Sequence, residues 1–120
     1  MAKLLLIDDD PTILEMFKLA LSKAGFEVIT AKDGDEGLAA FAEQKPDVCV
    51  VDIAMPGIDG YEVAERIRDS DRSNIPVIFL PAHDQSVMRA HADEVGVDLY
   101  LKKPIRPADL VTHIKKLVKP

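Results

Sequence analysis

Three short runs of the chain are continuously apolar, and each lies between longer segments whose apolar residues recur with the period of an α-helix. A strand is apolar without interruption when both of its faces are buried, as in the centre of a parallel sheet. We therefore expect central strands at Leu4–Ile7, Val48–Val51 and Val77–Leu80. Polar residues interrupt the runs Phe26–Ala31 and Val97–Leu101, which predicts the two edge strands of the same sheet.

Five amphipathic helices are predicted to connect and follow these strands. The first has Asp10 as its N-cap, Pro11 at its first position and Gly25 after its last turn, and the fifth begins at Pro107. The fourth, Ser86–Val95, has only a weak apolar pattern. The apolar stripes of the other four are Ile13, Leu14, Phe17, Leu21 and Ala24 in the first, Leu38, Phe41 and Ala42 in the second, Val63, Ala64 and Ile67 in the third after an Asp59-Gly60 turn, and Leu110, Val111, Ile114, Leu117 and Val118 in the fifth.

Strict alternation of strands and helices predicts an α/β fold: a doubly wound, five-stranded parallel sheet with helices on both faces. With the three apolar runs in the centre, the strand order is 2-1-3-4-5, the flavodoxin-like arrangement. The 120 residues are enough for one domain, which we expect to span residues 1–120. In such sheets the functional crevice lies at the carboxyl ends of the strands where the order reverses, here between the first and third strands.

Charged residues follow the strands that meet at this crevice. Asp8, Asp9 and Asp10 come after the first strand, Asp52 after the third and Lys103 after the fifth. Carboxylates of neighbouring strands repel each other unless a cation intervenes, and a cluster of carboxylate oxygens with room for a phosphate suits Mg²⁺. An aspartate can then attack a phosphoryl group while the metal and the ammonium group neutralise the transferring oxygens. We expect Asp10 to act as the helix cap instead.

Composition and charge exclude several classes of protein. The formal net charge of −6 argues against a dedicated nucleic-acid-binding domain. No apolar run is long enough to cross a membrane, and the one cysteine, Cys49, lies in an apolar strand where a packed thiol is expected. We therefore expect a cytoplasmic domain with no membrane partner and, for this domain alone, no nucleic-acid partner.

Three segments together carry a resemblance to a known family. They are Leu4–Pro11 (LLLIDDDP), Val50–Gly60 (VVDIAMPGIDG) and Gly96–Pro104 (GVDLYLKKP). At these residues the sequence closely resembles the receiver domain of response regulators in two-component signal transduction, including the single-domain chemotaxis regulators. The resemblance covers essentially the whole chain.

The resemblance implies a set of roles for individual residues. It makes Asp52 the phosphoacceptor, Asp8, Asp9, Asp52 and the carbonyl of Ala54 the ligands of Mg²⁺, Lys103 the contact to the phosphoryl group, and Tyr100 the aromatic side chain that rotates on switching. It implies a histidine kinase or a histidine phosphotransfer protein as phosphoryl donor and a downstream protein target for the surface of helix four, strand five and helix five. Such a protein is a phosphoacceptor, not an enzyme: it catalyses only its own phosphotransfer and dephosphorylation. It acts either alone or as the receiver of a longer protein.

One position departs from the family pattern. Receivers end the fourth strand with Thr or Ser, whose hydroxyl reaches the phosphoryl oxygen, whereas Pro81 follows Leu80 here. Proline has no hydroxyl and no backbone N–H. This departure favours an alternative, a non-switching pseudo-receiver that binds a partner as a scaffold or adaptor irrespective of phosphate.

A third possibility is an enzyme. Asp8-x-Asp10-x-Thr12 also satisfies the signature of haloacid-dehalogenase-type phosphatases. The chain is short for that family, has no second acidic pair on a later strand, and would leave the Asp52 segment unexplained. We therefore set this possibility below the two receiver hypotheses.

Overall fold

The structure is a computed structural model that describes residues 2–52, 58, 60–70, 74–82, 99–102 and 105–117. The predicted fourth helix, Ser86–Val95, lies outside these residues. The elements in chain order are β1 (Lys3–Ile7), α1 (Pro11–Lys23), β2 (Glu27–Ala31), α2 (Gly34–Gln44), β3 (Val48–Val51), α3 (Gly60–Arg68), β4 (Val77–Ala82), β5 (Leu99–Lys102) and α5 (Pro107–Leu117).

All five strands form one parallel sheet in the order β2-β1-β3-β4-β5, which confirms the predicted topology. The three uninterrupted apolar runs are its central strands, and the two interrupted ones are its edges. At the carboxyl end of β1, Ile7 is opposite Ala31 of β2 and Val51 of β3. The neighbouring strands thus end at the same level, so the residues that follow them emerge side by side.

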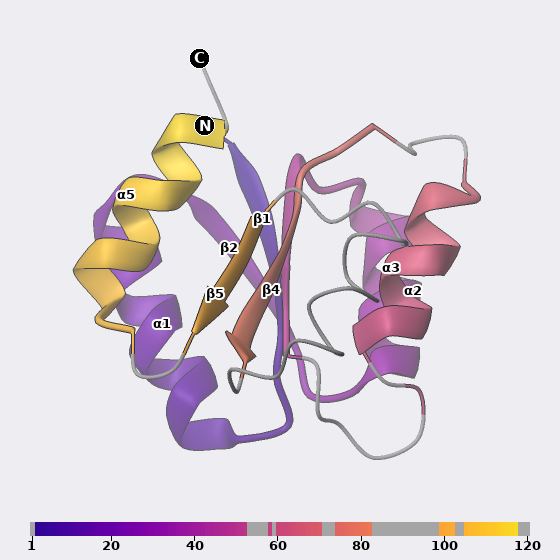
Figure 1. Cartoon of the computed structure of the whole chain (residues 1–120), viewed down its shortest axis with the longest axis horizontal. Helices are drawn as coiled ribbons and strands as arrows, with labels where there is room; N and C mark the ends of the chain where they lie inside the picture. Colours follow the sequence, from indigo (N-terminus) through magenta and orange to yellow (C-terminus); the bar gives the residue numbers. More distant parts are fainter. Residues whose placement is uncertain are drawn as a thin grey trace.

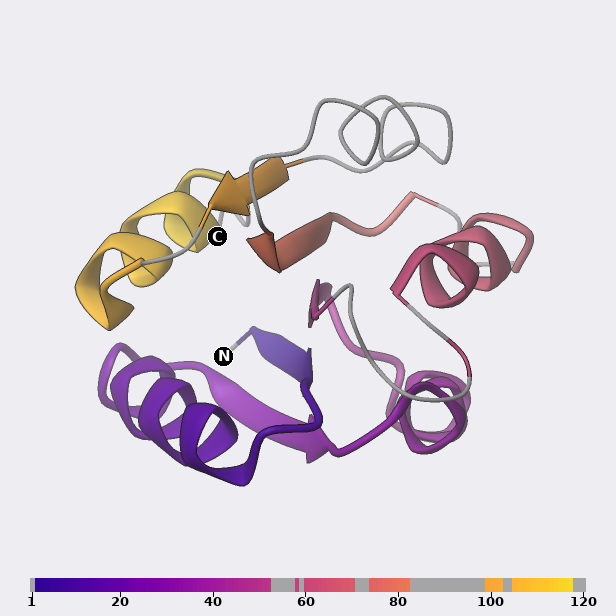
Figure 2. The ribbon, with the colours of Figure 1, turned by 60° about the horizontal axis from the view of Figure 1, so that its bottom comes forward.

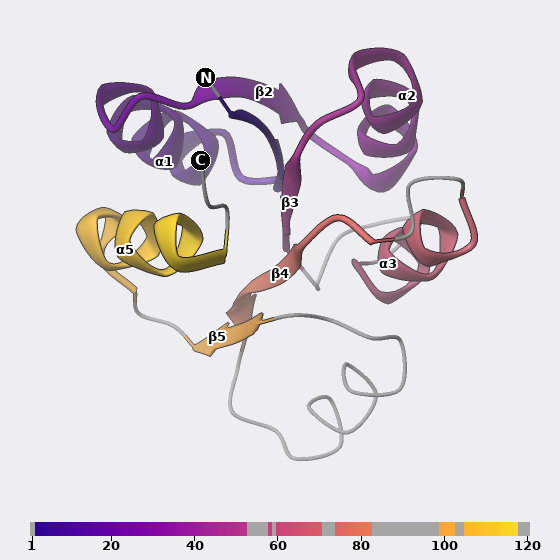
Figure 3. The same cartoon turned by 90° about the horizontal axis from the view of Figure 1, so that it is seen from above.

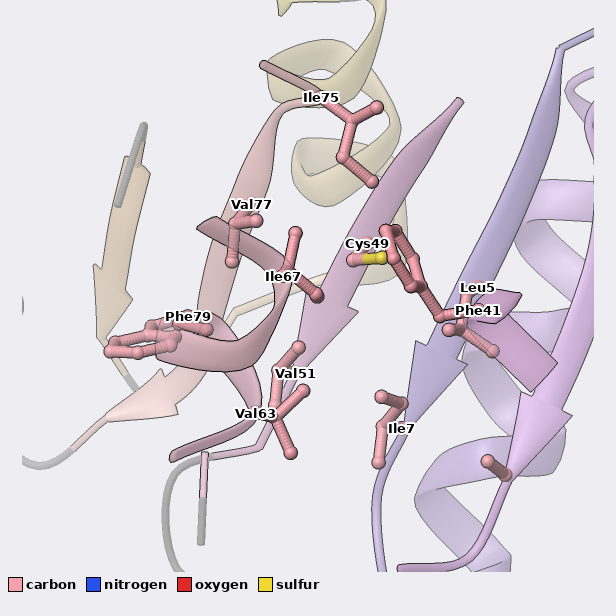
Figure 4. Packing of buried hydrophobic residues seen from close by; sticks show 12 residues of the cluster. Leu5, Ile7, Phe41, Cys49, Val51, Val63, Ile67, Ile75, Val77 and Phe79 are labelled. Atoms are coloured by element: carbon pink, nitrogen blue, oxygen red, sulfur yellow. The ribbon is translucent and has the colours of Figure 1, made fainter. Parts of the chain in front are cut away.

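Helices cover both faces of the sheet. α1 and α5 lie against one face, and α2 and α3 lie against the other (Figures 1 and 3). Successive side chains of a strand point to opposite faces, so each apolar strand supplies both layers of the core. Leu4, Leu6, Val48, Val50 and Ile78 pack with the helices α1 and α5. Leu5, Ile7, Cys49, Val51, Val77 and Phe79 pack with the helices α2 and α3 (Figure 4).

The ends of α1 follow the predicted signals. The Asp10 side chain accepts hydrogen bonds from the backbone N–H groups of Thr12 and Ile13, and Pro11 is the first helical residue. After the helix, Gly25 has φ +101°, a left-handed conformation that glycine adopts without a steric penalty. The chain is thereby turned into β2.

The buried face of α2 includes Phe41 and the partly buried Leu38, as predicted, but differs from the prediction at Ala42. Ala42, which was expected in the apolar stripe, is exposed, and the fully buried residues are Gly34, Gly37 and Phe41. Two of these three are glycines, which carry no side chain for a hydrophobic pattern to detect. The spacing of three and four residues still places them on one helical face, rotated away from Ala42.

The fourth strand is longer than predicted. Instead of ending at Leu80, β4 continues through Pro81 to Ala82, and β5 extends to Lys102. The pairing of β4 with β5 slips by one residue, because Phe79 is opposite Tyr100 whereas Ala82 is opposite Lys102. Such a β-bulge is where a sheet tolerates proline, which cannot donate to the ladder.

No helix in the described part of the chain is long and apolar enough to cross a membrane.

Candidate functional site

Backbone hydrogen bonds fix two aspartates at the carboxyl ends of adjacent strands. The N–H of Asp52 donates to the carbonyl of Ile7 (2.9 Å), which extends the pairing of β1 with β3 by one residue. The N–H of Asp8 donates to the carbonyl of Ala31 (3.1 Å), which does the same for β1 and β2. Figure 2 turns this edge of the sheet towards the reader. The backbone of the site is therefore a continuation of the sheet.

The side chains of Asp8, Asp9 and Asp52 converge. One carboxylate oxygen from each can be chosen so that all three lie within 4.8 Å of one another. Asp8 and Asp52 are only 5% and 8% exposed, whereas Asp9 is exposed. An Oδ1 atom of Asp8 also accepts a hydrogen bond from the N–H of Asp10 (2.9 Å). The cluster therefore combines two buried carboxylates, Asp8 and Asp52, with one carboxylate, Asp9, that is exposed to solvent.

This arrangement fits a hard divalent cation. Three carboxylates at such short range repel one another, and bringing a cation between them removes that repulsion. Three carboxylate oxygens, one of them from the exposed Asp9, suit Mg²⁺, which keeps several waters and accepts a phosphate oxygen as a further ligand. Among the described residues, this is the one group of three acidic, histidine or cysteine side chains with a spacing that could hold a metal ion.

Asp10 has the role that the sequence suggested. Its Oδ1 atom is 2.9 Å from the N atom of Thr12 and 3.4 Å from that of Ile13, so the carboxylate caps α1. The exposed N-terminal N–H groups of a helix favour such an oxygen. Of the three consecutive aspartates, Asp8 and Asp9 therefore belong to the cluster, and Asp10 caps the helix.

The other predicted site residues are placed less completely. Ala54 and Lys103 lie outside the described residues. Tyr100 lies in β5 opposite Phe79, and Pro81 lies in β4, two residues beyond the last position at which β4 pairs with β3. The structure thus brings together Asp8, Asp9 and Asp52, while the roles assigned to these three residues and to the other four stay predictions.

Sequence reasoning missed one contact beside the site. Gly34, the first residue of α2, lies against Ile58, which follows β3 and precedes α3. The only signal for it in the sequence is a glycine at the start of a helix, directly after the N-cap Asp33.

Comparison with known proteins gives a consistent result. The model of the response regulator receiver domain family matches residues 4–115. The chain is 39% identical over 119 residues to the transcriptional regulatory protein AfsQ1 of Streptomyces coelicolor, covering 99% of this chain and 52% of that protein. It is 32% identical over 117 residues to the alkaline phosphatase synthesis transcriptional regulatory protein PhoP of Bacillus subtilis, covering 98% and 48%. The chain thus spans about half the length of these two relatives.

Solved structures share the whole fold. The chemotaxis protein CheY4 of Vibrio cholerae superposes with a TM-score of 0.93 at 31% identity, covering 98% of this chain and 99% of that one. A response regulator receiver domain protein of Clostridium thermocellum superposes with a TM-score of 0.90 at 34% identity, covering 98% and 94%.

Proposed function

The chain belongs to the response regulator receiver domains of two-component signalling, and on this basis we propose that it accepts a phosphoryl group on Asp52. The observation that carries the proposal is the convergence of Asp8, Asp9 and Asp52 at the edge where β1 and β3 end. In the proposed role the protein is a phosphoacceptor in the cytoplasm. It catalyses only its own phosphotransfer and dephosphorylation and acts on no other substrate.

Each side chain of the site has a part in the transfer. Asp8 and Asp9 hold Mg²⁺ together with Asp52 and, as in the family, the carbonyl of Ala54. Bound Mg²⁺ supplies positive charge that offsets the charge on the phosphoryl oxygens. A carboxylate oxygen of Asp52 attacks phosphorus, so an oxygen–phosphorus bond forms as the bond to the donor's leaving group breaks and that group departs with the electron pair. The Lys103 ammonium group contacts the same phosphoryl oxygens.

The donor is a phosphohistidine of a histidine kinase or of a histidine phosphotransfer protein, and α1 is the surface that meets it. The helix starts directly after the three consecutive aspartates Asp8, Asp9 and Asp10. Two large apolar side chains on its outer face, Met16 and Leu19, are 42% and 55% exposed. They line a shallow hollow together with Pro11, Thr12 and Glu15. An exposed apolar surface on the helix that follows these aspartates lets a partner dock and present its phosphoryl group to Asp52.

Intact-mass measurement with acetyl phosphate as a small donor tests the chemistry. We expect one added phosphoryl group that depends on Mg²⁺ and is absent in Asp52→Asn. Lys103→Ala should slow the labelling, whereas the matched variant Lys102→Ala should leave it near normal, because successive residues of an extended segment point to opposite sides. Labelling that persists in Asp52→Asn would contradict the assignment, and equal effects of the two lysines would contradict the role of Lys103.

A second function is favoured by one observation, the position of Pro81 within a bulge of β4. Without a hydroxyl there, phosphorylation lacks one of the contacts that distinguish the active conformation. The alternative proposal is a receiver that does not switch and that binds its protein target as a scaffold irrespective of phosphate. A beryllofluoride adduct separates the two proposals: a switching receiver changes its amide chemical shifts as far as Tyr100, and a scaffold changes them only around the acidic cluster.

A further inference from the structure

Gly37 of α2 lies so close to Ile7, the last residue of β1, that a side chain at position 37 has no room. A Cβ atom added there would lie 2.4 Å from Cδ1 of Ile7, 2.9 Å from its Cγ1 and 3.4 Å from its Cγ2. Carbon atoms that are not bonded prefer separations of about 3.5–4.0 Å. The backbone of α2 therefore packs directly against the Ile7 side chain, and even the methyl group of alanine requires one of the two to move.

The Ile7 side chain has little freedom to turn aside. It is fully buried, and in the sheet it lies between Ala31 of β2 and Val51 of β3, which belong to the same core cluster. Two of the three atoms nearest to position 37 are γ carbons, which are bonded directly to the Cβ of a β-branched residue, and such side chains are stiff about χ1. Rotation of the outer Cδ1 atom alone leaves the 2.9 Å approach in place. Relief of the contact thus requires the backbone of β1 or of α2 to shift.

A shift of β1 reaches the acidic cluster through the backbone of Ile7. The carbonyl of Ile7 accepts a hydrogen bond from the N–H of Asp52 (2.9 Å), and Asp8 is the next residue in the chain. The position of Ile7 therefore bears directly on both of the buried carboxylates.

A shift of α2 reaches the cluster by a second route. The N–H of Gly37 donates to the carbonyl of Asp33 (2.9 Å), and the side chain of Asp33 accepts from the N–H of Glu36 (2.8 Å), so the first turn of the helix is tied to Asp33. Two residues before Asp33 is Ala31, whose carbonyl accepts the N–H of Asp8 (3.1 Å). Either movement that makes room at position 37 thus bears on a backbone group that holds one of the aspartates.

We propose that Gly37 is a positioning residue for the metal site: its lack of a side chain lets α2 pack against Ile7 where the backbone aligns Asp8 and Asp52. The inference rests on the proposed function, because it concerns Mg²⁺ at the acidic cluster. Residues that orient metal ligands from outside the ligand shell commonly change metal affinity by about 10- to 100-fold when altered.

The test is a titration of ¹⁵N-labelled protein with Mg²⁺, followed through the amide shifts of Asp9 and Asp52. We expect Gly37→Ala to raise the half-saturating Mg²⁺ concentration about tenfold. The matched control is Gly25→Ala, where an added Cβ would meet nothing within 4 Å but φ is +101°, so alanine is strained. Gly25 lies before β2, at the other end of the strand from Ala31. Gly25→Ala should lower the melting temperature and leave the half-saturating concentration at the wild-type value.

A compensating exchange tests the contact itself. Ile7→Val removes Cδ1, the atom nearest to position 37, so Ile7→Val combined with Gly37→Ala moves one carbon from the strand to the helix and keeps the total volume. The double variant should bind Mg²⁺ more tightly than either single variant, and the comparison with Ile7→Val holds even if Gly37→Ala does not fold. Wild-type affinity in Gly37→Ala, an equal loss in Gly25→Ala, or a double variant that binds no better than Ile7→Val would overturn the inference.

Hydrogen exchange in the metal-free protein separates this inference from the proposed function. The amides of Asp8 and Asp52 should exchange faster in Gly37→Ala than in Gly25→Ala, each measured at the same interval below its melting temperature, because their hydrogen bonds are displaced. Equal exchange in the two variants would count against the inference. Failure of the proposed function has a different signature: the wild type itself would not bind Mg²⁺, or Asp52→Asn would bind it as tightly, with the exchange result unchanged.

Discussion

The three clustered carboxylates should make the metal-free protein less stable than a variant that lacks one of them. Asp9→Asn is the suitable change because Asp9 is exposed, so a side chain of equal size can replace it without repacking. Asp9 faces Asp8 and Asp52 with oxygens within 4.8 Å. At that separation each repulsion is worth about 0.9 kcal/mol in a water-like dielectric. Salt at ~0.1 M screens the two repulsions to a sum of about 1 kcal/mol.

The assay is urea unfolding followed by circular dichroism, with EDTA and again with excess Mg²⁺. In EDTA the free energy of unfolding of Asp9→Asn should exceed that of the wild type by about 1 kcal/mol. With Mg²⁺ the order should reverse, because the wild type binds the ion more tightly, and a ligand at 100 times its Kd adds about 2.7 kcal/mol to the stability of the folded state.

Asp10→Asn is the control for this prediction. It removes a neighbouring negative charge outside the cluster, and asparagine caps a helix as well as aspartate does. It should not gain stability in EDTA, and it should keep the full response to Mg²⁺. An Asp9→Asn protein that is no more stable than the wild type in EDTA, or that gains as much as the wild type from Mg²⁺, would refute the electrostatic reasoning.

Two further predictions concern the partner surface and the switch. Leu19→Glu, on the exposed face of α1, should slow phosphotransfer from a phosphohistidine donor and leave labelling by acetyl phosphate unchanged; equal slowing of both would show that α1 acts on the chemistry rather than on docking. Pro81→Thr should spread the shift changes of the beryllofluoride adduct to Tyr100, since a hydrogen bond to a charged oxygen is worth about 1.5 to 3 kcal/mol, roughly ten- to a hundredfold in the equilibrium. A wild type that already responds as widely as Pro81→Thr would show that the proline does not impair switching.

The parts of the fold that depend on burial were predictable from the sequence. Leu4–Ile7 and Val48–Val51 are apolar at every position because both faces of β1 and β3 are covered, and this property alone placed them in the centre. Their central position, with the rule that sites lie where the strand order reverses, predicts from the sequence alone that Asp8 and Asp52 lie close together.

The features that the sequence did not predict involve residues that lack a particular group: glycines, which have no side chain, and a proline, which has no backbone N–H. Gly34 and Gly37 are buried on the face of α2 that carries Phe41, but hydrophobic periodicity weighs side chains, so the sequence pattern favours Ala42, which is exposed. The end of β4 was misjudged for a similar reason. Pro81 lacks a backbone N–H, which predicts the end of the strand, whereas in the structure Pro81 lies within β4, where the pairing with β5 shifts its register.

The order of the strands in the sheet also affects how the chain folds as it is synthesised. β2, β1 and β3 are neighbours in this order in the sheet, and all three lie within the first 51 residues, so the three residues of the acidic cluster all lie at or before Asp52 in the chain. The partner of β3 on its other side is β4, which begins at Val77. A ribosome adding about 5–20 residues per second takes seconds to reach it. During that interval the apolar strand Val48–Val51 has no partner on that side, and an unpaired apolar strand edge is a site at which chains aggregate.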